Sequence, residues 1–333
     1  MKRLFTTAIM VMAVMVLAGC ASAQTGGNTN TITAPILAAQ LAAEFNAMSE
    51  ASATASGGTV TLTENVWIEN SLTVPEGVTL DLTKKGVKFT LKDGVTLTVD
   101  GTVNIAGHGF RGDVWEEGSL FFEDGTNVIN GSGTINVKND GCLFNFDGGN
   151  KLILDGVTMV GVSGNTNSLI NFGSGSEVVM KSGLITGNSS GVGGGVGVYS
   201  GGTFTMEGGT ISGNSTTIRP DGLGGQGGGV RIWQGTFIMK GGVISGNSAT
   251  AGGGVGIVGG NGSTFIMEGG TIYGNSADGG NANTATRSAA VSVDTGMTAK
   301  WGTGGTYTIG GVNQTGGGNI ASTNDTLIAI PAR

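Results

Sequence analysis

One stretch of the sequence brings together side-chain types that acid–base chemistry uses. Residues 107–125 (GHGFRGDVWEEGSLFFEDG) hold His108, the one histidine of the chain, near the acidic neighbours Glu116 and Glu117. Cleavage of a glycosidic bond needs two carboxyl groups about 5–10 Å apart on one face. Neighbours in an extended chain point to opposite sides, so Glu116 and Glu117 do not meet this condition as a pair. Asp113 with Glu116 could meet it in a loop, although nothing in the sequence requires that arrangement.

The same stretch carries residues that suit binding. Arg111, Asp113 and Trp115 combine both signs of charge with a large aromatic ring. The triplet Arg-Gly-Asp at 111–113 is an integrin-binding motif, but a motif of three residues often occurs by chance. We interpret 107–125 as a solvated loop with these three candidate binding residues, and catalysis through residues 108–117 stays open as the alternative.

A second group of residues suits the binding of a ring. Tyr199 and Trp233 occupy equivalent places in two successive repeats, and Arg231 points outward beside them. Exposed aromatic rings next to a cation can stack against a sugar ring or an aromatic partner. A covering loop or a neighbouring subunit would explain the same residues. The insertions 216–226 and 278–288 lengthen two corners nearby and form either a lip beside Trp233 or tolerated surface loops.

A repeated phrase must position these residues. It reads FTMEGGTISGNS at 204–215, FIMKGGVISGNS at 237–248 and FIMEGGTIYGNS at 265–276. Apolar and polar residues alternate around it with a period of two, which indicates strands. The apolar residues that end the first strand of successive units are Val99, Ile129, Leu154, Met180, Met206, Met239 and Met267. Units of this length with several short strands and no helix predict a parallel β-solenoid, in which each unit forms one coil.

Two columns of side chains follow from this register. In the first column the sign of the charge alternates, and its members are Asp155, Lys181, Glu207, Lys240 and Glu268. Opposite charges at strand spacing attract each other, by about 0.2–1 kcal/mol for an exposed pair. The second column holds Asn188, Asn214, Asn247 and Asn275. We expect each asparagine to turn a corner and to bond the next one along the solenoid. Both columns therefore have structural roles.

The N-terminal segment predicts export. Two basic residues (2–3) precede an apolar run at 4–17, which ends in the letters LAGC at 17–20. A basic start, an apolar run and small residues at the end are the parts of a secretory signal. The last four residues resemble the bacterial lipobox, which implies that Cys20 is lipidated and becomes the mature N-terminus. Lipid at Cys20 would anchor the protein to a membrane face without a spanning helix.

Composition and charge exclude several classes. Glycine accounts for 67 of 333 residues but lacks the strict Gly-X-Y period of collagen. Cleavage after residue 19 removes Lys2 and Arg3, so the net charge moves from −7 to −9. Such an acidic protein is poorly suited to bind nucleic acid through phosphate contacts. Cys142 is the one other cysteine, so no intrachain disulfide framework is expected, and its place beside apolar residues indicates a buried thiol.

The repeats carry a family resemblance. The motif IxxN (244–247), followed by GGGV (252–255), is similar to the paired FxxN and GGAI repeats of chlamydial polymorphic outer-membrane proteins. More broadly, about residues 58–300 resemble the right-handed, pectin-lyase-like parallel β-helix of bacterial surface proteins. The resemblance implies an adhesin or surface antigen, while polysaccharide lyases occur elsewhere in the same fold. Such a lyase would need a calcium-binding cluster of carboxylates and a basic residue over one groove, and we find no such column on adjacent repeats.

The sequence therefore predicts an all-β protein, a right-handed parallel β-helix of roughly ten coils with a short N-terminal capping helix. The predicted parts are a signal peptide at 1–19, a lipidated cysteine and tether at 20–32, a capping helix at 33–56 and the β-helix at 57–333. We expect a non-enzymatic cell-envelope lipoprotein, on the outer membrane or cell surface, that binds a glycan, a matrix or a protein partner. A polysaccharide lyase or glycoside hydrolase acting through 107–125 and a structural envelope spacer are the alternatives. We expect no metal, cofactor or nucleic acid.

Overall fold

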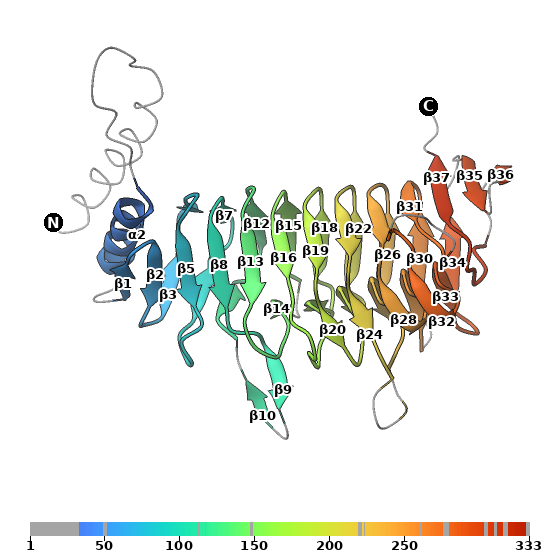
Figure 1. The fold of residues 1–333 in the computed structure, drawn as a ribbon, viewed down its shortest axis with the longest axis horizontal. Helices are drawn as coiled ribbons and strands as arrows, with labels where there is room; N and C mark the ends of the chain where they lie inside the picture. Colours follow the sequence, from blue (N-terminus) through green and yellow to red (C-terminus); the bar gives the residue numbers. More distant parts are fainter. Residues whose placement is uncertain are drawn as a thin grey trace, which may run out of the picture. The chain divides into compact units, whose positions relative to one another are not determined.

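The structure, a computed structural model, describes residues 33–48, 52–111, 114–116, 118–146, 149–218, 222, 224–259, 262–275, 280–302, 306–309, 312–315 and 319–330. Residues 1–32 form one unit and residues 33–333 another. The first unit lies outside the described residues, and with it the predicted signal peptide, tether and Cys20. The described residues of the second unit fold into an all-β parallel β-helix with one N-terminal helix, as the sequence predicts (Figure 1).

Stacked parallel strands build the faces of the coils. Sheet A covers the first face. Its parallel strands are β2 (Thr59–Leu62), β5 (Thr79–Leu82), β8 (Thr102–Ile105), β13 (Thr134–Val137), β16 (Thr158–Val160), β19 (Leu184–Thr186), β23 (Thr210–Ser212), β27 (Val243–Ser245) and β31 (Gly270–Ile272). Sheet B covers the second face. Its strands are β4 (Leu72–Val74), β7 (Thr96–Val99), β12 (Thr126–Asn130), β15 (Lys151–Asp155), β18 (Glu177–Met180), β22 (Thr203–Met206), β26 (Thr236–Met239), β30 (Thr264–Met267) and β34 (Thr298–Trp301).

The third face changes sheet along the solenoid. Toward the N-terminus it carries sheet D, whose strands are β3 (Val66–Ile68), β6 (Phe89–Leu91) and β11 (Leu120–Phe122). Next to β11 begins sheet C, whose strands are β14 (Phe144–Phe146), β17 (Ile170–Phe172), β21 (Val196–Tyr199), β25 (Val230–Trp233), β29 (Val255–Val258) and β33 (Val291–Val293). A short sheet E precedes sheet C in the later coils, with strands β20 (Ser189–Ser190), β24 (Ser215–Thr216), β28 (Ser248–Ala251) and β32 (Thr284–Arg287).

Antiparallel strands close both ends of the solenoid. The sequence predicts roughly ten coils, and sheet B has nine strands among the described residues. At the N-terminal end β1 (Ala53–Ser56) pairs antiparallel with β2, so the boundary predicted at 56/57 falls inside a hairpin. At the C-terminal end β37 (Leu327–Ile330), β35 (Thr306–Ile309) and β36 (Val312–Thr315) extend sheet A from β31 in antiparallel fashion. Strand β37 pairs antiparallel with β31, the open edge of sheet A in the last coil. The parallel coils therefore end before residue 333.

The helix α2 (Ala34–Met48) covers the N-terminal end, where the sequence predicts a cap. Leu37, Leu41 and Phe45 follow Pro35 at helical spacing, which predicts one apolar stripe. Leu41 and Phe45 are buried, and the ring of Phe45 meets Phe89 edge-on with the centroids 6.1 Å apart. The apolar face of the helix therefore shields the core of the first coils from water.

The inward residues of the repeated phrase fill the core. Three phenylalanine rings stack along the solenoid with centroids 5.1 Å apart in each adjacent pair, and they belong to Phe204, Phe237 and Phe265. Met206 is fully buried two residues after the first ring. At the corner that follows on the next coil, Gly242 has a φ of 84°, and a Cβ there would lie 2.6 Å from Cε of Met206. Glycine is required at this corner because of both its backbone conformation and the methionine packed against it.

The register of sheet B agrees with the sequence from Ile129 onward. Ile129 pairs with Leu154, and the pairing continues through the successive methionines to Met267. The expectation for Val99 is wrong, because Ile129 pairs with Leu97. A Cβ on Gly131 would lie 2.3 Å from the carbonyl oxygen of Val99, so the chain already turns its corner above this residue.

The charged column lies on the outer face of sheet B. Lys240 Nζ is 3.9 Å from Glu207 Oε1 in an exposed ion pair. Asp155 instead accepts a 2.6 Å hydrogen bond from Ser182 Oγ. The backbone bonds of Lys181 and Glu268 to the preceding coil place these two residues in the same column.

The asparagine column runs through the buried corner between sheets A and E. Asn214 Nδ2 donates to Asn247 Oδ1 at 3.1 Å, and Asn247 Nδ2 donates to Asn283 Oδ1 at 3.0 Å. At the other end Asn165 Nδ2 donates to Asn188 Oδ1 at 2.8 Å. The rungs are therefore Asn165, Asn188, Asn214, Asn247 and Asn283, all of them buried.

Asn275 is not a rung of this column, which corrects the sequence prediction. Its side chain is exposed, and its backbone N–H bonds to Asn324 O in the C-terminal segment. The insertion delays the corner, so that Thr284 rather than Ser276 pairs with Ser248. The left-handed residue is also not the asparagine, since Gly246, before Asn247, has the positive φ of 63°.

Candidate functional site

Sheet C places the two aromatic residues on one outward column. Tyr199 on β21 lies opposite Trp233 on β25, and Trp233 lies opposite Val258 on β29. Their neighbours Val198 and Ile232 are fully buried. Because side chains alternate between the two faces of a strand, Tyr199 and Trp233 face the same outer side.

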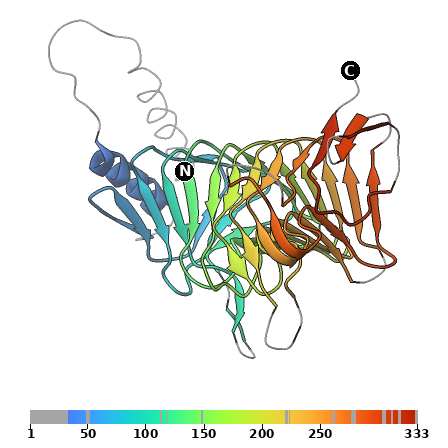
Figure 2. The same ribbon diagram turned by 45° about the vertical axis from the view of Figure 1, so that its right-hand side comes forward.

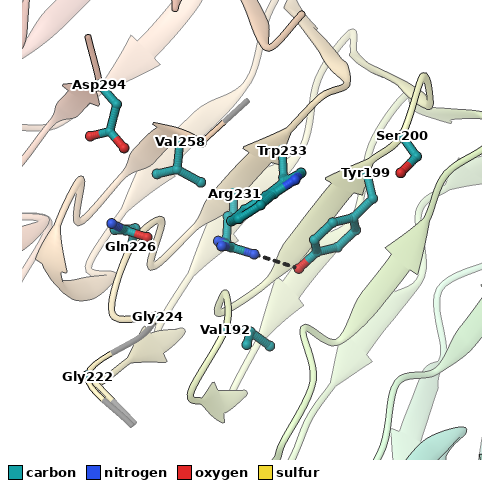
Figure 3. A pocket seen from close by; sticks show the side chains of 11 residues that line it. Val192, Tyr199, Ser200, Gly222, Gly224, Gln226, Arg231, Trp233, Val258 and Asp294 are labelled. Atoms are coloured by element: carbon teal, nitrogen blue, oxygen red, sulfur yellow. Dashed lines mark hydrogen bonds between the residues drawn. The ribbon is translucent and has the colours of Figure 1, made fainter. Parts of the chain in front are cut away.

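Arg231 lies beside both rings and is far more buried than an outward arginine is expected to be. Only 6% of its surface is exposed. Its Nη1 donates a 3.2 Å hydrogen bond to Tyr199 Oη (Figure 3). The guanidinium carbon lies 4.8 Å from the ring centroid of Trp233 and 5.7 Å from that of Tyr199. Both distances allow cation–π attraction, so Tyr199, Arg231 and Trp233 hold one another in place. We call these three residues the aromatic–arginine cluster.

Two glycines make room for the cluster. Gly197 on β21 and Gly256 on β29 lie directly opposite Arg231 on the neighbouring coils. A Cβ on Gly197 would lie 2.5 Å from Cε2 of Tyr199, so any larger residue there would displace that ring. The absence of side chains on both neighbours lets the long arginine lie close to the sheet.

The cluster forms one wall of a surface pocket with a cavity volume of about 520 Å³. Gln226 and Asp294 add polar groups to the lining, and Val258 adds an apolar one (Figure 3). Trp233 is 39% exposed, which leaves indole surface available to a ligand. The pocket is open to solvent along one side, and its aromatic surface and few polar groups can contact one face of a ligand.

The insertion 216–226, one of the two that the sequence offers as a lip beside Trp233, contributes to the lining of the pocket. Gly222, Gly224 and Gln226 come from the insertion 216–226, which lies beside Trp233 as a lip would. Val192 comes from the preceding coil, and no described residue of 278–288 lines the pocket. Gln226 could have been predicted as a lining residue, because its insertion lies next to an outward aromatic column. Nothing in the sequence singles out Val192.

The segment 107–125 contains a hairpin, so the expectation of a loop is wrong there. Strands β9 (Gly109–Arg111) and β10 (Val114–Glu116) pair antiparallel, and they project from the sheets (Figure 1, Figure 2). The sequence contains a signal for this hairpin, because two residues, Gly-Asp, separate two short runs that contain aromatic residues. Asp113 and Glu117 lie outside the described residues, as do the side chains of Arg111, Trp115 and Glu116.

His108 has a structural environment at the base of this hairpin. It is 7% exposed, and its Nε2 lies 2.8 Å from Leu120 O, which can only accept a hydrogen bond. Its backbone N–H and C=O both bond to Cys142, at 2.9 and 2.7 Å. The ring also contacts Phe121 edge-on with the centroids 4.9 Å apart. These contacts fix the imidazole inside the protein.

Cys142 is buried beside His108, as its sequence neighbours indicate. It is 1% exposed, and burial raises the pKa of its thiol to about 12. The thiolate is the reactive form of cysteine, so this side chain is poorly suited to act as a nucleophile.

Among the described residues, no three His, Cys, Asp or Glu side chains gather as metal ligands would. No helix in the described part of the chain is long and apolar enough to cross a membrane. Comparison of the chain with protein family models, with curated proteins and with solved structures gives no match.

Proposed function

We propose that the protein is a non-enzymatic, adhesin-like lipoprotein of the cell envelope, whose β-helix presents the sheet C pocket to a glycan. The single observation that carries this proposal is the aromatic–arginine cluster. Trp233, which is 39% exposed, holds its ring 4.8 Å from the guanidinium carbon of Arg231 in the wall of a pocket of about 520 Å³. Aromatic rings that are fixed before binding give contact area at a low entropic cost, which suits a flat sugar ring.

The remaining parts of the proposal concern the anchor and the location. The LAGC letters at 17–20 support lipid attachment at Cys20, and the basic and apolar segment before them supports export. A lipid-anchored protein on the outer membrane or cell surface could hold the pocket toward a matrix or another cell. The buried environment of His108 favours a structural role for this residue over a catalytic one.

Retention on immobilised polysaccharides tests the proposal. We expect the full-length protein to be retained by at least one member of a panel of neutral and acidic polysaccharides, and Trp233→Ala to abolish that retention. Trp67→Ala is the matched control, because Trp67 is an exposed tryptophan on strand β3 of sheet D, away from the pocket. Equal loss in both variants would contradict the proposed site. New reducing ends or unsaturated products, assayed in the same tubes with calcium, would favour a lyase or hydrolase instead.

A further inference from the structure

Arg231 interrupts a column of small, uncharged residues. The residues opposite it along sheet C are Gly197 and Gly256, and the next ones outward are Asn171 and Ser292. No described acidic side chain forms an ion pair with Arg231, and its Nε has no hydrogen-bond partner. A charge that is 94% buried normally needs an opposite charge or a full set of hydrogen bonds. Stacking on Trp233 and one bond to Tyr199 compensate this guanidinium only in part.

The acid in the pocket does not neutralise Arg231. Asp294 follows β33, which lies two strands beyond β25 in sheet C. Two strand spacings separate the backbones by about 10 Å, and no ion pair joins Asp294 to Arg231 among the described residues. Val258 lies between Trp233 and Asp294 in the pocket wall (Figure 3). The pocket therefore has a positive end at the aromatic–arginine cluster and a separate acidic group at its far end.

Further unpartnered polar atoms lie next to the cluster. Ser168 is fully buried, and its Oγ has no hydrogen-bond partner. A Cβ on Gly193 would lie 2.6 Å from Ser168 Oγ and 3.1 Å from Arg231 Cβ. The Ser168 hydroxyl and the base of the Arg231 side chain therefore lie close together. Asn171 Oδ1 is also unpartnered and lies 2.6 Å from the Cβ position of Gly197. Neither Ser168 nor Asn171 lines the pocket, so Arg231 is the residue of this group that a ligand in the pocket can reach.

We propose that the pocket selects an acidic glycan, whose carboxylate or sulfate group pairs with the guanidinium of Arg231 while a sugar ring lies on Trp233. This inference rests on the proposed glycan-binding function and names the ligand class of the same site. Arginine suits carboxylate and sulfate because its planar fork donates two parallel hydrogen bonds. The chain has a net charge of −7, so its overall field repels an acidic glycan. Binding of such a ligand therefore has to come from a local contact.

Calorimetric titration of the full-length protein tests the inference with three probes of equal length. The probes are a sulfated glycosaminoglycan oligosaccharide, a uronate oligosaccharide without sulfate, and a neutral glucose oligosaccharide. We expect an acidic probe to bind at least tenfold more tightly than the neutral one, because a hydrogen bond to a charged group contributes about 1.5–3 kcal/mol, or roughly 10- to 150-fold. The sulfated and unsulfated probes distinguish the two sources of the anion.

Three variants assign that preference to Arg231. Arg231→Gln should remove the preference for acidic probes, and Arg231→Lys should retain part of it, because lysine keeps the charge but not the fork. Arg287→Gln is the matched control, since it removes the same charge from an exposed arginine on strand β32 and should change nothing. The far-ultraviolet circular dichroism of each variant checks that the coils are intact, and Arg231→Lys keeps the test valid if the glutamine variant fails to fold.

Two results would overturn the inference, and they differ in what they say about the site. Equal affinity for neutral and acidic probes, with binding lost in Trp233→Ala, would leave the glycan site in place and remove its acidic specificity. Binding of no probe at all would remove both the specificity and the proposed glycan-binding function. Preference for acidic probes that survives in Arg231→Gln would assign the anion contact to another residue and contradict the role of the guanidinium.

Discussion

The buried asparagines join successive coils through side chains that water does not reach. Asn247 illustrates this: its Nδ2 bonds to Ile211 O, Ser245 O and Asn283 Oδ1, and its Oδ1 accepts from Asn214. Without the amide the backbone N–H of Asn214 would lose its acceptor and two backbone carbonyls would lose a donor, while Asn283 Oδ1 would keep its bond from the backbone N–H of Asn247. At the residue scale, the stability of the β-helix therefore depends on a few polar side chains as well as on its apolar core.

Asn247→Ala should lower the stability of the protein markedly. Each buried group left unpaired costs about 1–3 kcal/mol, so we expect a loss of roughly 2–4 kcal/mol and a lower midpoint of thermal unfolding. Asn275→Ala is the matched control, because Asn275 is exposed and outside the column, and it should leave the midpoint unchanged. A larger effect at Asn275 than at Asn247 would contradict the assignment of the rungs.

Cys142 should make stability fall at alkaline pH. Burial raises the pKa of this thiol from 9.0 to about 12, so the folded state favours the protonated form. The stabilisation is therefore complete below the pKa of the unfolded chain and is lost as the pH rises from about 9 toward 12. Unfolding midpoints between pH 8 and 11, compared between the native protein and Cys142→Ala, measure this loss. A slope that is the same in both proteins would show that another group causes it.

At the scale of elements, the alternation of charge on sheet B contributes through exposed pairs. Lys240 lies between two acids of the column, Glu207 and Glu268, and it pairs with Glu207 at 3.9 Å. Both side chains of this pair are almost half exposed, so solvent screens their attraction and its contribution is small.

Lys240→Glu should lower the unfolding midpoint, because it places three acids in succession at strand spacing. We expect a loss of about 0.5–1 kcal/mol at low salt, and a smaller loss at 1 M salt, where charges are screened within about 3 Å. Lys240→Gln removes the ion pair without adding a negative charge. Its unfolding midpoint should therefore lie between those of the native protein and Lys240→Glu. An unchanged midpoint for Lys240→Glu at low salt would show that the charged column does not contribute to stability.

The regular strands of sheet B follow from the sequence because their apolar residues recur in every coil, even across the insertion 216–226. The period-two alternation and the recurring glycine corners predict the register from Ile129 to Met267, because an in-register stack allows little else. The prediction for Asn275 is wrong because an insertion lies between the end of the repeated phrase and the corner of the coil. The letters NTAT at 283–286 match NSAT at 247–250 and could have indicated Asn283.

The candidate site could be predicted only in part for a similar reason. Register alone brings Tyr199 and Trp233 together, since both belong to the regular part of sheet C. The burial of Arg231 depends on two glycines in other coils and on a tyrosine ring that reaches across the strand. Long side chains choose among rotamers according to neighbours that are distant in sequence, and the repeat pattern does not specify those choices.

At the scale of the whole molecule, the proposed anchor and the pocket lie in different units of the chain. The lipobox-like letters belong to residues 1–32, and the pocket belongs to residues 33–333. The proposed envelope adhesin would need both units, because lipid at Cys20 would decide at which membrane face the pocket is held.

Cys20→Ser should release the protein from the membrane fraction. A diacylated cysteine supplies two acyl chains, which is the usual requirement for stable anchoring. Fractionation of cells that express the native or the substituted protein, followed by immunoblotting, measures the distribution. Cys142→Ser is the matched control and should stay with the membranes. Membrane retention of Cys20→Ser would count against lipidation.

Hydroxyl-radical footprinting of the full-length protein, with and without the polysaccharide that retains it, shows directly whether the ligand lies in the sheet C pocket. Mass spectrometry then reports the oxidation of each aromatic residue. If the sheet C pocket binds the polysaccharide, Trp233 and Tyr199 become protected and Trp67 is unchanged. Protection of Trp67 or of the hairpin at 109–116, with Trp233 oxidised as fast as before, would place binding elsewhere and rule out the sheet C pocket.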